Sequence, residues 1–233
     1  MKKLFTMMLV GVLGFTMVGC SNASDDTDQV ENKNESTEEQ KVESNQNENQ
    51  DSKTLVAYFT YAENANLSDN VDTSSSASIQ VWNDEVTGNA GVLAHMISES
   101  TDADLFSIQT VEKYPSSYEE TVDQGQAENE ENARPELSTH IENLDEYDTI
   151  FIGFPNWWYD MPMAMYTFFE EYNFSGKTII PFSTSGGSGF SSTIETMREL
   201  EPNATVEDGI TIGASSVMDA QSEIDEWLHS FGY

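Results

Sequence analysis

The chain has only one cysteine among its 233 residues, Cys20, and so it cannot form an intramolecular disulfide bond. Its three histidines, His95, His140 and His229, lie far apart in the sequence. Metal sites built from cysteine and histidine have short ligand spacings, and no such spacing occurs here. The sequence therefore predicts neither a disulfide-stabilised fold nor a metal site of this kind.

Basic residues are scarce as well. The chain carries 9 Lys and Arg against 42 Asp and Glu, which gives a formal net charge of -33. Nucleic-acid binding depends on clustered Lys and Arg that neutralise phosphates, so we expect no nucleic-acid partner. An anionic lipid surface would repel the chain for the same reason. The expected partners are proteins with basic surfaces, and small ligands that are shielded from the negative field.

No apolar run reaches the roughly 20 residues that a transmembrane helix needs. The longest, from Leu4 to Val18, follows Lys2 and Lys3 and has the length of the apolar core of a signal peptide. It leads into Met17-Val18-Gly19-Cys20, which resembles the lipobox of bacterial lipoproteins. This resemblance implies a signal peptide over 1–20 that ends at a lipidated Cys20. An uncomplicated signal peptide with a chance cysteine is the alternative.

Lipidation of Cys20 implies a location at the cell membrane, on its extracytoplasmic side, with palmitate-type chains as the only membrane contact. Residues 21–52 follow and consist mainly of Glu, Asp, Asn, Gln, Ser and Thr, without a single aromatic residue. Such a segment cannot bury enough apolar area to offset the entropy of ordering its backbone. We expect a disordered, acidic tether over 21–52.

From residue 53 onward, short apolar segments alternate with helical patterns. Strands are predicted over 54–60, 103–109, 149–153, 178–183 and, more weakly, 206–212, and helices over 89–99, 117–129, 162–172, 192–200 and 219–230. Nearly continuous apolar runs suit strands that are buried on both faces of a parallel sheet. Five strand–helix repeats predict one doubly wound α/β domain over 53–233, in which ligands bind beyond the carboxyl ends of the strands.

Three loops at that end of the sheet carry the candidate chemistry. After Thr60, a polar insert over 61–86 separates the first strand from Thr87-Gly88-Asn89, where helix amides and hydroxyls favour an anion. After the third strand comes Pro155-Asn156-Trp157-Trp158, whose indoles suit a flat aromatic ligand. After the fourth, Thr184 to Gly189 is glycine-rich and offers backbone N–H groups. A capped helix, core tryptophans and a flexible turn are the respective structural alternatives. The insert has no interpretation from the sequence.

Several segments together resemble the flavodoxin-like family across nearly all of 53–233. They are Leu55-Val56-Ala57-Tyr58-Phe59-Thr60, Thr87-Gly88-Asn89, Asn132-Ala133-Arg134-Pro135, the run from Tyr147 to Pro155, Trp157-Trp158, and the run from Ser175 to Phe182 with the glycine loop after it. The resemblance implies a sheet order of 2-1-3-4-5 and FMN as the cofactor.

The resemblance also assigns the site residues. It places Thr60, Thr87, Gly88, Asn89 and Ala90 at the phosphate, and Pro155, Asn156, Trp157 and Trp158 at the flavin ring. It places Thr184, Gly186, Gly187, Ser188 and Gly189 at the ring edge. The family's phosphate loop runs directly into Thr-Gly-Asn-Thr, whereas here the insert splits it and Ala90 replaces the last threonine. One hydroxyl donor is thereby missing, which is worth about 1 kcal/mol.

Three functions remain open on the sequence. The first is an FMN-dependent electron carrier at the outer face of the membrane, which exchanges electrons with basic redox partner proteins. The second is an FMN-dependent oxidoreductase of a small acceptor such as a quinone. The third is a non-catalytic binding lipoprotein that has lost the cofactor, which the split phosphate loop favours. The fold by itself decides among none of these. No side chain is predicted to be catalytic.

Overall fold

The computed structural model describes residues 53–67 and 79–233. The predicted signal peptide over 1–20, its lipidated Cys20 and the predicted tether over 21–52 lie outside the described residues, and so does the middle of the insert. Within the described ranges, no helix combines the length and the apolar character needed to cross a bilayer.

The centre of the domain is a parallel sheet in the predicted order. Strand β1 is flanked by β4 on one side and by β5 on the other, and β6 follows β5. The bounds are β1 (Lys53–Tyr58), β4 (Asp104–Ser107), β5 (Tyr147–Pro155) and β6 (Thr178–Ser185). Since β4 is the second strand of the sheet along the chain and β5 the third, the order 2-1-3-4-5 is confirmed.

The fifth position of the sheet is shared by two short strands. β7 (Thr205–Val206) and β8 (Ile210–Gly213) both pair with β6 in parallel, where the sequence predicts one strand over 206–212. The break between them lies opposite Ile180 and Pro181 of β6. Proline has no backbone N–H, so the ladder loses a donor at this point and the chain bulges through Gly209 before pairing resumes.

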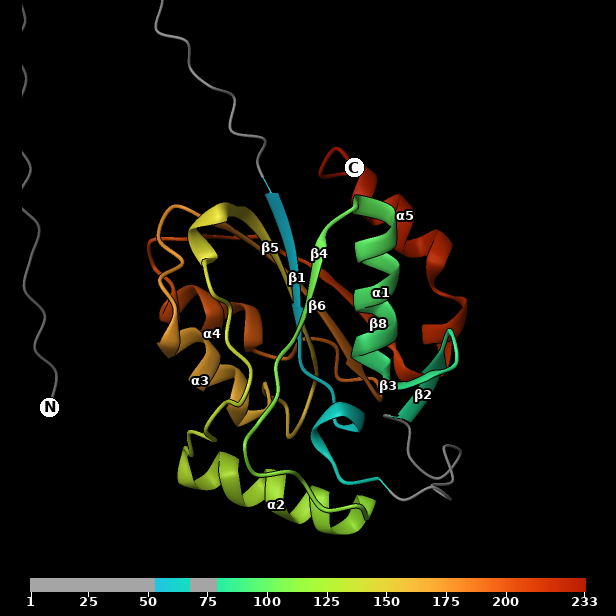
Figure 1. Ribbon diagram of the computed structural model, residues 1–233, viewed down its shortest axis with the longest axis vertical. Coiled ribbons are helices and arrows are strands. Elements are labelled where there is room, and N and C mark those ends of the chain that lie inside the picture. The colour runs from blue at the N-terminus through green and yellow to red at the C-terminus, as the bar shows by residue number, and fades with distance from the viewer. Residues whose placement is uncertain (1–52, 68–78) are drawn as a thin grey trace, which may run out of the picture. The chain divides into compact units, whose positions relative to one another are not determined.

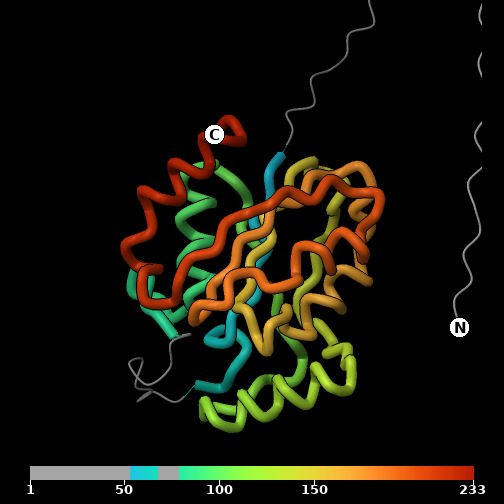
Figure 2. Tube along the Cα trace, turned by 180° about the vertical axis from the view of Figure 1, so that it is seen from behind, coloured from blue at the N-terminus to red at the C-terminus, as the bar shows by residue number. Residues whose placement is uncertain are grey.

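Two helices cover each face of the sheet (Figure 1). α1 (Asn89–Thr101) and α5 (Gln221–His229) pack on one face, and α3 (Met163–Glu171) and α4 (Thr193–Leu200) on the other (Figure 2). The doubly wound α/β architecture is therefore confirmed. The bounds of these helices agree with the sequence to within two residues. Met161, Met163 and Met165 are buried, as expected of core residues.

The fifth helix, α2 (Tyr118–Glu131), is placed differently. It lies across the end of the sheet at which the parallel strands finish (Figure 1), and only Thr121 and Gly125 of its residues are buried. Ser117 caps it, because its hydroxyl accepts a hydrogen bond from the Glu120 amide. α2 thus forms a wall beyond the carboxyl ends of the strands, where the sequence predicts a helix over 117–129 and assigns it no role at the ligand.

The described part of the insert contains a β-hairpin that the sequence analysis did not predict. β2 (Ile79–Trp82) pairs antiparallel with β3 (Glu85–Gly88), and the turn residues Asn83 and Asp84 have φ values of 49° and 68°. These values match the two-residue turn that joins hairpin strands, in which Asn and Asp tolerate positive φ. The hairpin delivers Thr87 and Gly88 directly to the start of α1.

Candidate functional site

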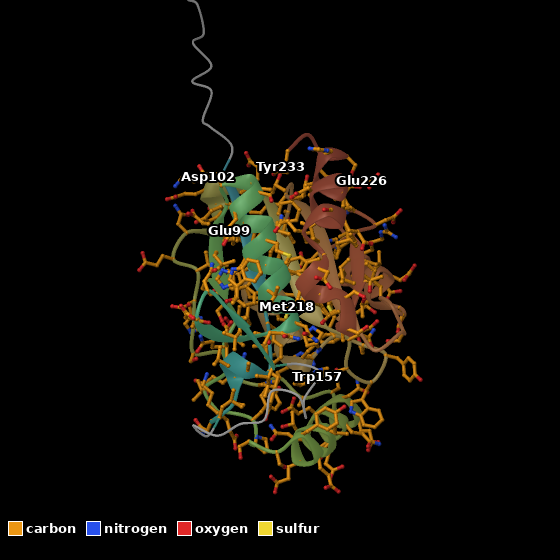
Figure 3. The ribbon with its side chains drawn as sticks, turned by 90° about the vertical axis from the view of Figure 1, so that its right-hand side faces the viewer. Glu99, Asp102, Trp157, Met218, Glu226 and Tyr233 are labelled. Carbon is orange, nitrogen blue, oxygen red and sulfur yellow. The ribbon has the colours of Figure 1, made fainter. Side chains whose placement is uncertain are left out.

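A cavity of about 360 Å³ opens at the carboxyl ends of β5 and β6, between the sheet and α2. Figure 3 shows Trp157 in this region, at the opposite end of the sheet from Tyr233. Half of the residues predicted to bind the cofactor line the cavity. They are Asn89, Pro155, Asn156, Trp157, Trp158, Thr184 and Gly186. The structure therefore brings together residues from all three predicted loops.

A second, more open cavity of about 600 Å³ adjoins the first. Asn156, Trp158 and Gly186 line both, so the two cavities share one wall. The second cavity adds Gly187 and Ser188 of the predicted set, together with Tyr159. Residues of the Trp158 loop and of the glycine-rich loop line both cavities.

Five predicted residues line neither cavity. Thr60 is buried, and its carbonyl accepts a hydrogen bond from the Asn64 side chain. Ala90 packs in the core, and Gly88 precedes the first residue of α1. The remaining two, Thr87 and Gly189, form hydrogen bonds within the protein that are described below. The resemblance assigns all five to the ligand, and their role there stays a prediction.

The two tryptophans differ although they are adjacent. Trp157 packs edge-on against Phe59 and Tyr114, with centroid distances of 5.6 and 5.4 Å. Trp158 is 44% exposed, and its indole N–H donates to the carbonyl of Val122 in α2 over 3.2 Å. Trp157 is therefore held by the core behind the cavity, and Trp158 joins the mouth of the cavity to α2.

Trp158 and Tyr159 occupy an unfavourable backbone conformation. Their φ values are 54° and 63°, and Trp157 and Asp160 exchange two backbone hydrogen bonds of 2.9 Å across them. This is a two-residue turn of the kind that normally takes Asn and Gly. Bulky residues at positive φ store about 1–3 kcal/mol each, and such strain gathers at ligand sites. Tyr159 is nevertheless 72% exposed, so burial does not explain its place.

The glycine-rich loop is stabilised from within. The Ser185 hydroxyl accepts hydrogen bonds from the amides of Gly187 (3.2 Å) and Gly189 (3.0 Å). The side-chain amide of Asn156 donates to the Gly189 carbonyl (3.0 Å) and to Ser191 (3.1 Å). Two amides that the sequence offers to a ligand are thus engaged by Ser185, and Asn156 positions the loop from the opposite side.

Helix α2 contributes cavity residues that the sequence analysis missed. Tyr118, Thr121, Val122 and Gly125 all line the cavity, as do Tyr61, Ser185 and Ala214. One signal was available, because a glycine in the middle of a helix often marks a close approach. A Cβ added at Gly125 would lie 3.3 Å from the Trp157 ring. We call the aromatic wall formed by Tyr61, Tyr118, Trp157 and Trp158, with Gly186 facing it, the aromatic end of the site.

The other end lies where α1 begins. Asn89 lines the cavity there, and its side-chain oxygen accepts a hydrogen bond from the Gln80 amide over 2.7 Å. Behind it, the Thr87 hydroxyl donates to the carboxylate of Glu63 over 2.6 Å. Glu63 belongs to the short 3₁₀ turn η1 (Ala62–Asn64), which follows β1. We call Asn89, Thr87 and Glu63, with the side chains that bind Glu63, the anion end of the site.

Glu63 collects three hydroxyl donors. Tyr58 donates to its carboxylate over 2.9 Å, and Ser107 and Thr87 donate as well. Burial raises the pKa of the Tyr58 phenol well above its ordinary value of 10.0, and the negative charge of Glu63 raises it further. The Lys113 ammonium donates to the backbone carbonyl of Glu63 over 3.2 Å. Three hydroxyls from three different strands thus bind the Glu63 carboxylate.

The residues that the structure describes include no group of three or more His, Cys, Asp or Glu that could hold a metal ion. What the site offers is a flat aromatic wall, a glycine-rich loop that faces it and the start of a 13-residue helix at one end. This arrangement suits a planar ligand that carries an anionic group.

The chain is similar to several known proteins. The model of the family described as Flavodoxin matches residues 79–231. A candidate flavoprotein from Bacteroides uniformis is 28% identical, with a TM-score of 0.59, over 76% of this chain and 98% of that chain. For a candidate flavoprotein from Bacteroides eggerthii the values are 25%, 0.55, 74% and 98%. No curated protein matches the chain significantly.

A third solved structure shares the fold. It is a flavoprotein from Lactobacillus acidophilus in complex with FMN, which is 19% identical with a TM-score of 0.50. The alignment covers 73% of this chain and 99% of that chain. At this identity the likeness concerns the architecture alone.

Proposed function

The chain belongs to the flavodoxin family, and on this premise we propose that residues 53–233 bind FMN and transfer electrons to and from partner proteins. The observation that carries the proposal is the aromatic end of the site. Its cavity of about 360 Å³ falls within the range of roughly 300–1,000 Å³ that is usual for small-molecule sites. Trp158 and Tyr118 line it with aromatic side chains, and Gly186 lines it without a side chain.

The anion end also fits a phosphate. α1 begins at Asn89 directly after Gly88, and the positive end of its helix dipole favours an anion. In this proposal the aromatic end binds and orients the flavin ring, and the start of α1 holds the phosphate. Bound FMN would supply the redox chemistry. Trp158 would shield bound flavin from water, and its hydrogen bond to the Val122 carbonyl links this loop to α2.

Negative charge around the site affects both the reduction potential of a bound flavin and the kind of partner protein that binds. α2 contributes six acidic residues and no Lys or Arg, and it borders the cavity. Acidic side chains near a flavin disfavour the addition of negative charge to its ring and so lower its reduction potential. The same charges attract basic surfaces and accelerate encounter at low salt. The proposed partners are redox proteins with basic surfaces, and nucleic acid is not among them.

We further propose that Cys20 is lipidated and that the domain is anchored at the extracytoplasmic side of the cell membrane. This extends the proposal to residues outside the described ranges and is supported by the lipobox-like sequence. The described chain begins at Lys53, the amino end of β1, and the site lies at the carboxyl ends of the strands.

The test of FMN binding is a titration of the purified protein. We expect stoichiometric uptake of FMN, with a yellow absorbance and quenching of tryptophan fluorescence. Electron transfer is then measured from the reduced protein to a small basic haem protein, and its rate should fall as salt is added. Absence of FMN binding in equilibrium dialysis would instead favour a binding lipoprotein that has lost the cofactor. Labelling with a radioactive fatty acid, with Cys20→Ser as the control, tests the anchor.

The second cavity favours an additional candidate function. Its opening of about 600 Å³ between Tyr159 and Gly187 adjoins the first cavity. It has room for a small planar acceptor such as a quinone, which would make the protein an FMN-dependent oxidoreductase. Steady turnover of a quinone with a reduced nicotinamide would support this function. Electron exchange with the haem protein in the absence of quinone turnover would support the carrier.

A further inference from the structure

The Thr87 hydroxyl faces away from the ligand cavity. Only 2% of Thr87 is exposed, and the residue lines neither cavity. Its hydroxyl proton is donated to Glu63 over 2.6 Å. A hydroxyl has one proton to donate, so this group cannot at the same time donate to a phosphate. The donor that the Thr-Gly-Asn segment offers to an anion is therefore already in use within the protein.

Glu63 brings a negative charge close to the first turn of α1. A Cβ placed on Gly91, the third residue of α1, would lie 2.0 Å from the Thr87 hydroxyl oxygen. The hydroxyl oxygen thus lies against the first turn of α1, and the Glu63 carboxylate lies 2.6 Å from that oxygen. The positive end of the helix dipole attracts this carboxylate as it would attract a ligand anion. Glu63 acts as a built-in anion beneath the site.

This arrangement weakens the binding of a ligand phosphate at the start of α1 in two ways. It loses one hydroxyl donor, and it shares the field of the helix end with a carboxylate of the same sign. The Lys113 ammonium offsets part of this charge. At the aromatic end, Trp158 donates to the Val122 carbonyl of α2 and Tyr118 is the first residue of α2, so neither is held by Glu63.

We propose that Glu63 is a specificity-determining positioning residue, which holds the Thr87 hydroxyl out of the cavity and lowers the contribution of the phosphate to flavin binding. The site then recognises flavin mainly through its ring and discriminates only weakly between FMN and riboflavin, which lacks the phosphate. The inference rests on the proposed function, since it concerns how the proposed flavin site weighs the two halves of its ligand.

The experiment measures the dissociation constants of FMN and riboflavin for the full-length protein by quenching of tryptophan fluorescence. The variants are Glu63→Gln, Thr87→Val and, as a control that removes the same charge at the opposite end of the sheet, Glu146→Gln. Glu63→Gln should increase the preference for FMN over riboflavin about tenfold, the size expected for one charge-assisted interaction. Glu146→Gln should leave the preference unchanged. Riboflavin binding reports whether each variant retains its fold and ring site.

Thr87→Val provides a second, independent outcome. Because its hydroxyl is committed to Glu63, its removal should change FMN affinity less than about threefold, whereas loss of a hydroxyl that binds phosphate directly costs about tenfold or more. A tenfold loss of FMN affinity in Thr87→Val, with riboflavin binding intact, would overturn the inference. So would an unchanged FMN preference in Glu63→Gln. If neither flavin binds the wild-type protein, the proposed function fails, and the inference fails with it.

Discussion

The two ends of the candidate site are built from different ranges of the sequence. The aromatic end takes its central residues from one turn, in which Trp157 and Asp160 bond to each other around Trp158. At the anion end, Glu63 is 24 residues from Thr87 and 44 residues from Ser107. A local turn keeps its geometry through its own backbone, whereas a cluster of distant side chains depends on the fold. The turn at Trp158 can therefore be recognised in the sequence, whereas the bonds of Glu63 at the anion end are visible only in the structure.

The largest predicted effect comes from a substitution in the sheet, because the sheet supports both ends of the site. A Cβ added at Gly153 of β5 would lie 2.0 Å from the buried ring of Phe182 in β6. Gly153→Ala should therefore lower the free energy of unfolding by about 2–3 kcal/mol through overpacking. Urea denaturation measures this loss. Gly213→Ala is the matched control, because no atom lies within 4 Å of its Cβ position. Equal stability of the two variants would contradict the prediction.

The next prediction separates the two tryptophans of the aromatic end. Trp157→Ala removes a ring that packs against Phe59 and Tyr114, and it should lower the free energy of unfolding by about 2–3 kcal/mol. Trp158→Ala should change stability by less than about 1 kcal/mol, because its ring is 44% exposed. It should instead weaken binding of both FMN and riboflavin. Chemical denaturation and flavin titration on the same samples test the pair, and a reversed pattern would refute the assignment.

A substitution of Tyr159, beside Trp158, should stabilise the protein instead of destabilising it. Its φ of 63° and its 72% exposure mean that the side chain gains little from packing while its backbone is strained. Tyr159→Gly should raise the free energy of unfolding by about 1 kcal/mol, since glycine adopts positive φ without the steric penalty. Asn143→Gly, at a position with negative φ, should not stabilise the protein. Calorimetry checks both, and destabilisation by Tyr159→Gly would show that its ring packs more strongly than its exposure indicates.

Most features that depend on local sequence were predicted correctly, whereas several that depend on contacts between distant residues were not. The buried strands and the helices carry strong local patterns, and the sheet order was correct. The loop of Trp158 was placed at the ligand because it directly follows a buried strand. The split of the last strand depends on Pro181 in a neighbouring strand, which no local pattern includes. Likewise, nothing near Thr87 in the sequence indicates that its hydroxyl binds Glu63. The two residues are 24 positions apart, and no sequence pattern predicts that they are in contact.

The smallest expected effect concerns the titration of Tyr58 at the anion end. Burial raises the pKa of its phenol, and the charge of Glu63 raises it further. In Glu63→Gln the electrostatic part disappears while the burial remains, so the Tyr58 pKa should fall but stay above its ordinary value of 10.0. Phenolate absorbance during an alkaline titration, compared with that of the wild type, measures the difference.

The sign of the accompanying stability change follows from proton linkage. Above pH 10 the folded protein retains the Tyr58 proton that the unfolded chain releases, so stability falls as the pH rises from 10 towards the folded pKa. Because Glu63→Gln lowers the folded pKa, this loss should be smaller in the variant, with no difference in slope at neutral pH. Identical alkaline slopes would mean that the Glu63 carboxylate does not act on Tyr58, and the anion end would then lack the charge that distinguishes it from the aromatic end.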